Sequence, residues 1–393
     1  MKIEGNYEKN FFVSLSKEVY LFLVRLCSLG KRRKNDKIIF LVSFPSTSNY
    51  VLEALAEAYG DRLIICYTRN ARQMVSVFEK QGFKSYLVDS FAILCLKIIP
   101  ILKKSKLIIC DNYFAFLGGM ILDKQTNVVQ IWHANGAIKK FGLQAQYAKN
   151  AAPADRRRYQ KVYNKFTHFV VSSPTMATIF KDSYNIDPIF LKFGYPLTDY
   201  YYQLDDETIT YQKNALLEDM NKKIALYLPT YRENTDDNNP LDFDSISNQL
   251  NEDWALFIHP HPHDKKMIEL ANQYPEYFIK DDKDYDLKNL IAMADCLITD
   301  YSSVPFEYSL VNPRGKIIYF CYDFELYDEI VGIQEEFKKD IGSSIVKSSE
   351  ELFSSIETMG NEDLSDFNQT WNTYVSGRAI DSFLEWIDKQ YEI

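Results

Sequence analysis

Short runs of apolar residues alternate with amphipathic segments along the first half of the chain. These runs predict buried strands at 37–43, 62–67, 86–88, 107–110, 128–132 and 168–172. Between them lie segments with the apolar spacing of a helix, such as 50–59 and 71–81. Because the strands are apolar on both faces and alternate with helices, we expect a doubly wound parallel sheet.

The pattern breaks at 193–203, where Gly194, Pro196 and a run of tyrosines predict a connection between domains. A second series of strands is then predicted at 223–228, 254–258, 277–279, 296–299 and 316–320. The end of the chain has helical spacing at 350–359 and 378–391. The alternation of strand and helix in this second series indicates a second α/β domain.

We therefore predict an α/β protein with two Rossmann-like, doubly wound domains. The first is expected over 1–203 and the second over 204–375, with the helix in 376–393 packing back on the first. Open parallel sheets bind ligands at the carboxyl ends of their strands. Two such domains joined by a hinge are expected to face a shared cleft.

The composition is that of a globular protein and narrows the classes of function. Of the 393 residues, 46% are hydrophobic and 25% are charged, which excludes a disordered chain. The formal net charge of −9 argues against general nucleic-acid binding. The six cysteines lack CxxC spacing, so neither a zinc site nor a disulfide framework is expected. We find no signal peptide and no segment apolar enough to span a bilayer, which predicts a cytosolic chain.

Three segments combine apolar or helical character with basic residues. The apolar segment 21–26 runs into the basic cluster 31–34, and 91–102 precedes three lysines. The third is a basic group on an expected helix: Arg156, Arg157, Arg158, Lys161 and Lys165. The two apolar segments fit helices lying on an anionic membrane surface, and they fit core-facing helices with lysines at their ends equally well.

The first candidate for chemistry follows the strand predicted at 128–132. His133 stands there, ahead of a glycine-rich turn that carries Lys139 and Lys140. A titratable base next to fixed positive charge suits chemistry on a phosphorylated substrate, although a turn with solvated lysines has the same composition. Arg232 follows the strand at 223–228, where it can bind a phosphate or form an ordinary surface ion pair.

Two further motifs follow strands of the second domain. His259, His261 and His263 alternate with prolines, but no carboxylate or cysteine lies at zinc-ligand spacing, so we expect one histidine in the cleft and no metal. Asp300 can end the strand at 296–299, and Ser302 and Ser303 begin a helix. Hydroxyls and free N–H groups at a helix N-terminus form an anion site, or the serines simply cap the helix.

Taken together, these motifs resemble the CDP-glycerol glycerophosphotransferases that build wall teichoic acid in Gram-positive bacteria. The matching pieces are WHANGAIKKFG (132–142), LPTYR (228–232), HPH (259–261), LITDYSS (297–303), KIIYFCYDFELY (316–327) and VSGRAIDSFLEWI (375–387). The long WHAxGxxKxFG form resembles the primase branch, although Asn135 stands where the family often has a small residue. The resemblance implies a GT-B-like fold with the nucleotide donor held mainly by the C-terminal domain.

The primase resemblance also implies a reaction. Glycerol phosphate would pass from CDP-glycerol to ManNAc-GlcNAc-diphosphoundecaprenol, releasing CMP, at the cytoplasmic face of the cell membrane and with a peripheral attachment. It implies His133 as the base and His261 as a second catalytic residue. The implied CDP-glycerol ligands are Arg232, His259, Ser302 and Ser303, with Asp300 touching the donor or orienting a neighbour.

Lys139 and the arginines at 156–158 are implied contacts of the acceptor or of an anionic membrane. No cofactor is expected, with Mg²⁺ left open, and no nucleic acid is expected as a partner. The alternatives are a second-step glycerol- or ribitol-phosphate transferase of the same family, a sugar-nucleotide glycosyltransferase of capsule synthesis, and an inactive scaffold for lipid-linked intermediates.

Overall fold

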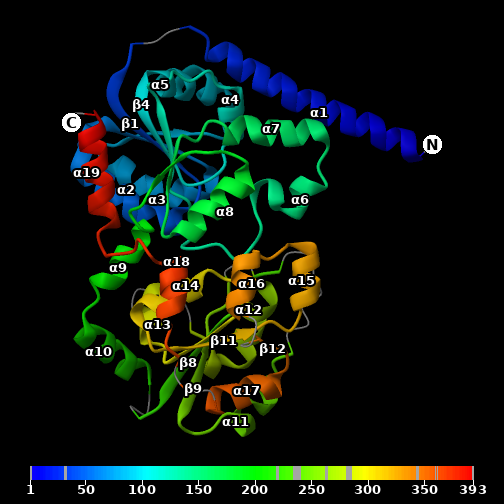
Figure 1. Cartoon of the computed structure of the whole chain (residues 1–393), viewed down its shortest axis with the longest axis vertical. Coiled ribbons are helices and arrows are strands. Elements are labelled where there is room, and N and C mark those ends of the chain that lie inside the picture. The colour runs from blue at the N-terminus through cyan, green and yellow to red at the C-terminus, as the bar shows by residue number, and fades with distance from the viewer. Residues whose placement is uncertain are drawn as a thin grey trace. The chain divides into compact units, whose positions relative to one another are not determined.

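The computed structural model describes residues 2–30, 33–217, 221–232, 240–261, 264–279, 286–341, 345–358, 360 and 362–391, with the backbone alone for 2–11, 245 and 247. The chain forms two compact units (Figure 1). The first comprises 1–134, 141–199 and 374–393, and the second comprises 135–140 and 200–373. The change at Asp199 falls within the connection predicted at 193–203. Of the expected basic cluster at 31–34, Lys31 and Arg32 lie outside the described residues.

The first unit is built on a parallel sheet with strand order β3-β2-β1-β4-β5-β6-β7. Its strands are β1 (Asn35–Val42), β2 (Leu63–Tyr67), β3 (Lys84–Leu87), β4 (Ser105–Cys110), β5 (Asn127–Gln130), β6 (His168–Val170) and β7 (Ile189–Leu191). The register pairs β1 with β4 up to Leu41↔Cys110, so the residues that follow these two strands are neighbours.

The helices of the first unit are α1 (Lys2–Cys27), α2 (Pro45–Tyr59), α3 (Arg72–Lys80), α4 (Phe91–Ile93), α5 (Ile99–Lys104), α6 (Gln146–Lys149), α7 (Pro153–Tyr163), α8 (Pro174–Tyr184) and α19 (Ala379–Tyr391). A π-helical turn, η3 (Leu94–Ile98), joins α4 to α5, and η4 (Ala115–Gly119) is a 3₁₀ helix. The C-terminal helix α19 belongs to this unit because Phe383 and Ile387 lie in its core, beside residues of β1 and α2.

The second unit contains a parallel sheet with strand order β12-β11-β10-β8-β9. Its strands are β8 (Lys223–Leu228), β9 (Trp254–Ile258), β10 (Cys296–Thr299), β11 (Lys316–Phe320) and β12 (Ile345–Val346). Its helices are α9 (Asp199–Tyr202), which starts at the boundary, α10 (Asp206–Leu216), α11 (Ile246–Gln249), α12 (Lys265–Gln273), α13 (Leu287–Met293), α14 (Val304–Val311), α15 (Phe324–Ile330), α16 (Glu335–Ile341), α17 (Ser349–Thr358) and α18 (Ser365–Trp371).

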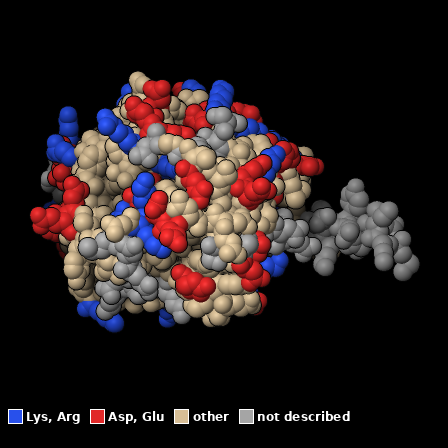
Figure 2. All heavy atoms as spheres, turned by 90° about the horizontal axis from the view of Figure 1, so that it is seen from below, with Lys and Arg blue, Asp and Glu red and all other residues tan. Residues whose placement is uncertain are grey.

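The prediction of two doubly wound parallel sheets is therefore confirmed. One predicted strand, 277–279, is wrong. Residues Pro275–Tyr277 form a 3₁₀ helix, and only a single bridge between Ile258 and Phe278 connects this segment to the sheet. Basic and acidic side chains are interspersed on the face of the molecule shown in Figure 2.

In each sheet there is one pair of neighbouring strands from which the chain continues to opposite sides of the sheet. In the first sheet β1 leads to β2 on one side while β4 leads to β5 on the other, so this pair is β1 and β4. In the second sheet the pair is β8 and β10. Open parallel sheets bind ligands at the carboxyl edge beside such a pair, so the loops that follow these strands are the candidates for a site.

Candidate active site

Asp111 lies immediately after β4, at the carboxyl edge of the first sheet. Its buried carboxylate accepts hydrogen bonds from the backbone N–H groups of Ser43 and Phe44 at 2.8 to 3.0 Å, and from the Ser48 hydroxyl at 2.9 Å. These donors lie between β1 and the first turn of α2, so one side chain ties together the two loops of the switch point. Burial raises the pKa of Asp111, and the hydrogen bonds from Phe44 and Ser43 oppose that shift.

His133 lies beside Asp111, just after β5. Its Nδ1 is 2.9 Å from the backbone carbonyl oxygen of Asp111. A carbonyl only accepts hydrogen bonds, so Nδ1 carries the proton of the neutral ring and the lone pair is on Nε2. Burial lowers the pKa of His133 to about 4, against an opposing contribution from the bond to Asp111. The imidazole is therefore neutral at physiological pH, with Nε2 unprotonated.

Aromatic rings hold the His133 imidazole in place. The ring of Phe44 stacks on it with centroids 3.8 Å apart and planes 10° apart, and the Trp132 ring lies at 4.2 Å. Trp132 has a φ of 65°, a left-handed conformation that is unfavourable for a bulky residue. Its backbone N–H donates to the Gln130 side chain at 2.9 Å, which helps to hold this turn. Strained backbone of this kind clusters at functional sites.

In the second unit, Arg232 lies in the loop after β8, but its guanidinium is directed at carboxylates. Nε and Nη2 donate to the two oxygens of Asp323 at 2.7 and 3.0 Å, and Nη2 lies 2.8 Å from Asp300. The Arg232 side chain is only 3% exposed, and the ring of Tyr322 packs 4.7 Å from it. The sequence allows Arg232 either to bind a phosphate or to form an ordinary ion pair, and the structure directs its donors to protein groups.

Asp300 is fully buried and connects the loops after β8 and β10. It accepts from the backbone N–H groups of Thr230 at 2.9 Å and Tyr301 at 2.7 Å, in addition to pairing with Arg232. A carboxylate with these partners and no exposed surface orients its neighbours. Of the two roles that the sequence leaves open for Asp300, contact with CDP-glycerol and orientation of a neighbour, this burial favours the second.

Ser302 and Ser303 stand where the loop after β10 enters α14, and both are half-buried. Ser303 is the N-cap residue of α14, yet its side chain makes no capping hydrogen bond. The expected alternative, ordinary capping by this serine, is therefore absent. A hydroxyl and backbone N–H groups at a helix N-terminus present hydrogen-bond donors to an anion.

The histidine motif follows β9 at the same edge of the sheet. The ring of His261 stacks on Tyr231, with centroids 5.5 Å apart and planes 14° apart, so the loops after β8 and β9 are in contact. His259 is buried, and its backbone N–H donates to Tyr227. His263 lies outside the described residues. In the part of the chain that the structure describes, no three His, Cys, Asp or Glu side chains are grouped to hold a metal ion.

The segment 135–140 follows Ala134 and belongs to the second unit. Asn135 is buried and donates to Asn372 at 2.9 Å, and Gly136 lies so close to Phe306 that an added Cβ would sit 2.4 Å from that ring. The asparagine that departs from the family's usual small residue therefore anchors this segment. Lys139 forms a backbone bridge with Ile333, and its ammonium lies 5.8 Å from the Tyr327 ring.

The three arginines at 156–158 do not form one surface. Arg156 and Arg157 are exposed on α7, whereas Arg158 is buried and pairs with Glu18 and Asp155, both at 2.7 Å. The expectation that Arg158 contacts a membrane is wrong, because its charge is used to hold α1 on α7. The sequence analysis also missed Asp111 and Asp323. An aspartate directly after an apolar strand, as in Asp300, is the signal that identifies Asp111.

Comparison with known proteins identifies the class of fold. A solved structure of the wall teichoic acid polymerase TagF superposes with a TM-score of 0.73, covering 98% of both chains at 18% identity. The predicted GT-B-like fold class is thereby confirmed.

Sequence comparison identifies the family. Residues 25–389 match the family described as CDP-Glycerol:Poly(glycerophosphate) glycerophosphotransferase. A teichoic acid glycerol-phosphate primase of Bacillus subtilis (strain 168) is 35% identical over 91% of this chain and 92% of its own length. A teichoic acid ribitol-phosphate primase of Bacillus spizizenii is 27% identical over 96% of this chain and 97% of its own. The chain belongs to the CDP-glycerol glycerophosphotransferase family, and the resemblance predicted from its motifs is confirmed.

Proposed function

We propose that this transferase is a teichoic acid glycerol-phosphate primase. It transfers sn-glycerol 3-phosphate from CDP-glycerol to lipid-linked ManNAc-GlcNAc-diphosphoundecaprenol and releases CMP. The observation that carries the proposal is the relationship to a glycerol-phosphate primase along nearly the whole of both chains. Each unit by itself also offers suitable groups after its strands: His133 in the first, and the N-terminus of α14 in the second.

The chemistry assigns His133 the role of general base. An acceptor hydroxyl attacks the β-phosphorus of CDP-glycerol, its proton passes to Nε2 of His133, and the bond from that phosphorus to the CMP oxygen breaks. The low pKa of His133 keeps Nε2 unprotonated before substrate binds. A bound diphosphate adds negative charge nearby, which raises the pKa of the imidazole and makes it a stronger base during the reaction.

The second unit holds the donor. We assign the diphosphate to the hydroxyls of Ser302 and Ser303, to the N-terminal N–H groups of α14, and to His261 with His259 beside it. Arg232 and Asp300 act through the loops that they connect, since the Arg232 guanidinium pairs with both Asp300 and Asp323. Lys139 is assigned to the acceptor diphosphate. No metal or other cofactor enters these steps.

The acceptor also sets where the enzyme works. An undecaprenyl chain remains in the bilayer, so we propose peripheral attachment at the cytoplasmic face of the cell membrane. Among the described helices, none has the length and apolar character required to cross a bilayer. Arg156 and Arg157 are exposed and remain assigned to the anionic membrane surface.

A second candidate is a ribitol-phosphate primase, favoured by the full-length relationship to that enzyme. One experiment separates the candidates. Purified protein is incubated with a short-chain analogue of the lipid disaccharide and with CDP-glycerol, CDP-ribitol or a UDP-sugar. Primase activity requires CMP release and an acceptor mass increased by one glycerol phosphate. Transfer from CDP-ribitol alone supports the second candidate, and transfer of a sugar or no transfer refutes both.

A further inference from the structure

A cavity of about 730 Å³ lies at the amino edge of the second sheet, and we call it the amino-edge cavity. Its wall includes the first residues of three strands, Lys223 of β8, Trp254 of β9 and Lys316 of β11, together with Asp295 just before β10. Ser303, assigned above to the donor, follows β10 at the opposite, carboxyl edge. Pockets that hold small molecules span about 300–1,000 Å³. The amino-edge cavity is therefore separate from the site already described and large enough for a metabolite.

Lys316 is the wall residue that points to a ligand. The residue is only 2% exposed, and its Nζ donates to the Ile356 carbonyl oxygen at 2.7 Å, near the C-terminus of α17. This contact uses one of the three N–H donors of the ammonium. Burial lowers the pKa of Lys316, and the charge of Lys223 adds to that shift, whereas Cys296 and Glu362 oppose it. Among the residues that the structure describes, none forms an ion pair with this ammonium.

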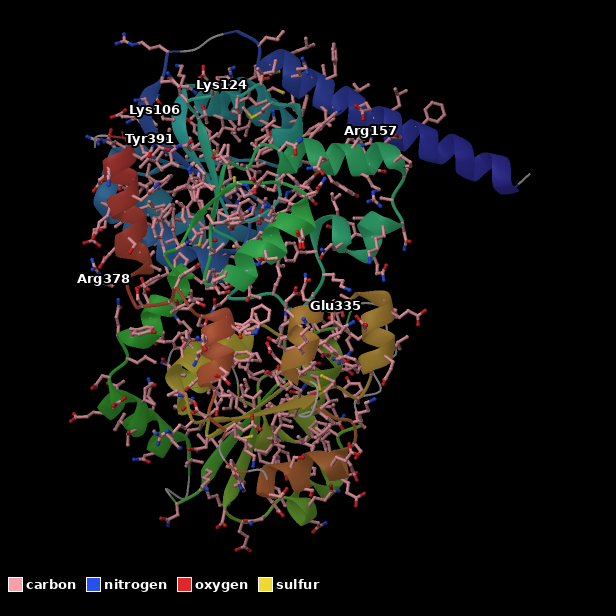
Figure 3. All side chains as sticks on the ribbon, viewed as in Figure 1. Lys106, Lys124, Arg157, Glu335, Arg378 and Tyr391 are labelled. Carbon is pink, nitrogen blue, oxygen red and sulfur yellow. The ribbon has the colours of Figure 1, made fainter. Side chains whose placement is uncertain are left out.

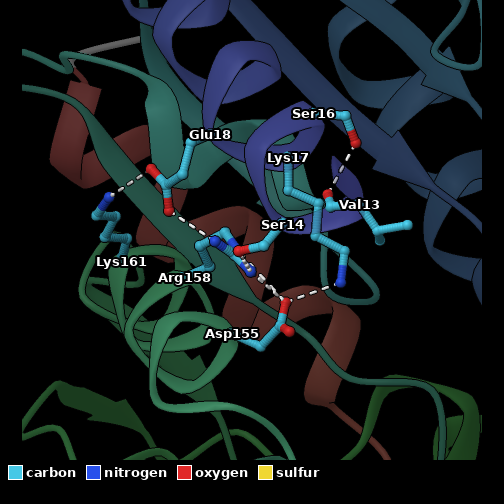
Figure 4. Close-up of polar contacts among 8 residues, drawn as sticks. All are labelled: Val13, Ser14, Ser16, Lys17, Glu18, Asp155, Arg158 and Lys161. Carbon is cyan, nitrogen blue, oxygen red and sulfur yellow. Dashed lines mark hydrogen bonds and ion pairs between the residues drawn. The ribbon is translucent and has the colours of Figure 1, made fainter. Parts of the chain in front are cut away.

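Two other cations illustrate how the chain neutralises charge that is set into the fold. In the first unit Arg158 bonds to Glu18 at 2.7 Å, as Figure 4 shows. In the second unit Lys140 bonds at 2.9 Å to Glu335, which is labelled in Figure 3. Lys316 is more deeply buried than Arg158, yet a carbonyl is its hydrogen-bond partner. Burying a cation without an opposite charge is costly, so an anionic ligand would stabilise this site.

Lys223 and Trp254 extend the positive region of the amino-edge cavity. The two residues pair in the register of β8 and β9, and Nζ of Lys223 is 5.4 Å from the centroid of the indole ring. Nζ of Lys316 is 5.7 Å from the same ring. Arg314, exposed in the turn before β11, adds a third positive charge to the wall. These like charges repel one another, and an anion between them would relieve the repulsion.

The wall also carries four carboxylates, most of which are engaged by protein groups. Three accept hydrogen bonds: Asp295 from Lys213, Glu357 from the backbone N–H of Asn251, and Asp363 from Ser365. The fourth, Asp253, is exposed. A cationic ligand would meet acceptors that are already in use, whereas an anion would meet ammonium donors that are open. The hydrogen bonding of the wall therefore favours an anion.

We propose that the amino-edge cavity binds a small phosphate monoester, with its phosphate on Nζ of Lys316 and Lys223 and the rest of the molecule beside Trp254. A phosphate monoester carries a charge of about −1.5 to −2 at pH 7 and three strong acceptor oxygens. One such group satisfies two ammoniums more fully than the single charge of a carboxylate does. The inference goes beyond the proposed function, because none of these residues is assigned to the transfer reaction.

Calorimetric titration of the full chain with inorganic phosphate, CMP and sn-glycerol 3-phosphate tests the site and distinguishes the sources of the phosphate. The test variant is Lys223→Met with Lys316→Met, which removes both ammoniums and keeps the length of the side chains. The matched control is Lys288→Met, whose ammonium lies 4.2 Å from the Tyr200 ring in the same unit but outside the cavity wall. We expect wild type and control to bind at least one probe. The double variant should bind that probe at least tenfold more weakly, the value of a hydrogen bond to a charged group.

Binding at the donor site is separated by two further variants. Ser303→Ala should leave the binding event at the amino-edge cavity unchanged. The event should also change tryptophan fluorescence in the wild type and lose that signal in Trp254→Phe. The proposal is overturned if no probe binds the wild type, or if the double variant binds every probe with wild-type affinity. Loss of all probe binding in Ser303→Ala would assign the phosphate to the donor site and overturn it as well.

Activity and folding controls complete the test. The double variant should transfer glycerol phosphate from CDP-glycerol at the wild-type rate in phosphate-free buffer, because the cavity lies at the other edge of the sheet. Absence of transfer by the wild type, with probe binding still weakened in the double variant, refutes the primase and supports the cavity site. Circular dichroism establishes folding. Lys223→Met alone, at an exposed position, should also weaken probe binding, and wild-type affinity in this folded variant would remove Lys223 from the site.

Discussion

The Nδ1 atom of His133 lies 2.9 Å from the backbone carbonyl oxygen of Asp111. The Asp111 carboxylate meanwhile holds the backbone of Ser43 and Phe44, and the Phe44 ring stacks on the imidazole. One residue therefore orients His133 through its main chain and supports the ring beneath it through its side chain. A base whose tautomer and position are both determined before substrate arrives needs no reorganisation during the reaction.

Replacing His133 by alanine should reduce kcat by about 10²–10⁴-fold, the usual contribution of a general base. CDP-glycerol affinity should change little, because the donor ligands are assigned to the second unit. CMP release and calorimetric titration measure the two quantities. His168→Gln is the control, a buried histidine at the amino end of β6 in the same unit, and it should keep full kcat. Normal turnover by His133→Ala would remove the base assignment.

The pH dependence should reflect the lowered pKa of His133, about 4. The ring loses its lone pair only as pH falls through that value, so kcat/KM should show no acid limb near 6.5. Under the proposed function, negative charge on bound substrate raises the pKa of the imidazole, so the acid limb of kcat should lie at higher pH than that of kcat/KM. Rates of CMP release across the acid range test both expectations. An acid limb of kcat/KM near the ordinary histidine value contradicts the buried imidazole.

The lowered pKa of His133 also makes the stability of the fold depend on pH. The unfolded chain binds a proton on His133 near pH 6.5 and the folded chain only near pH 4. The fold should therefore lose stability as pH falls through this window, by at most about 3 kcal/mol from this residue. Thermal unfolding of wild type and His133→Gln across the window isolates the effect. Parallel pH profiles for the two proteins would contradict it.

Asp111→Asn should lower both stability and turnover. The amide places an N–H group among the donors of Ser43, Phe44 and Ser48, so we expect a loss of about 1–3 kcal/mol in the free energy of unfolding. Displacement of Phe44 should also lower kcat without changing CDP-glycerol affinity. Thermal unfolding and CMP release are the measurements. A destabilised variant with unchanged kcat would show that Asp111 is structural only.

Ser303→Ala should weaken CDP-glycerol binding by about 10–100-fold, the value of a hydrogen bond to a charged group. Stability should stay within about 0.5 kcal/mol, because the hydroxyl makes no capping bond. Ser173→Ala is the complementary control, because the Ser173 side chain caps α8 by accepting a hydrogen bond from the backbone N–H of Met176. It should cost about 1 kcal/mol of stability and leave donor affinity unchanged. Unchanged donor affinity in Ser303→Ala would exclude this hydroxyl from the site.

Asp323→Asn tests the role of Arg232. Arg232 would lose the charged partner that accepts two of its hydrogen bonds and would keep Asp300. We expect the free energy of unfolding to fall by about 1–3 kcal/mol. We also expect a higher KM for CDP-glycerol, because the loop after β8 would be held less firmly. Glu325→Gln breaks the exposed pair with Lys347 in the same unit and should leave stability essentially unchanged, because solvent screens this pair. Loss of stability with unchanged KM would limit the Arg232 network to a structural role.

Much of the fold could be predicted from local patterns. Buried parallel strands are apolar along their whole length, so most strands of both sheets were found from their composition alone. The short strands β7 and β12 at the sheet edges were missed, because two or three residues carry too little pattern. At 277–279 an apolar run predicted a strand. The structure puts a 3₁₀ helix at Pro275–Tyr277, and pairing with β9 is limited to one bridge at Phe278.

Local sequence patterns are sufficient to predict the two α/β series, the family, and the positions of His133, His261 and Ser303 after their strands, because these depend on neighbours along the chain. Which charges are paired depends instead on contacts between distant segments. Arg232 meets Asp323 across 91 residues, and Arg158 meets Glu18 across 140. No local pattern encodes such pairs, since folding brings the partners together and burial then removes competing water.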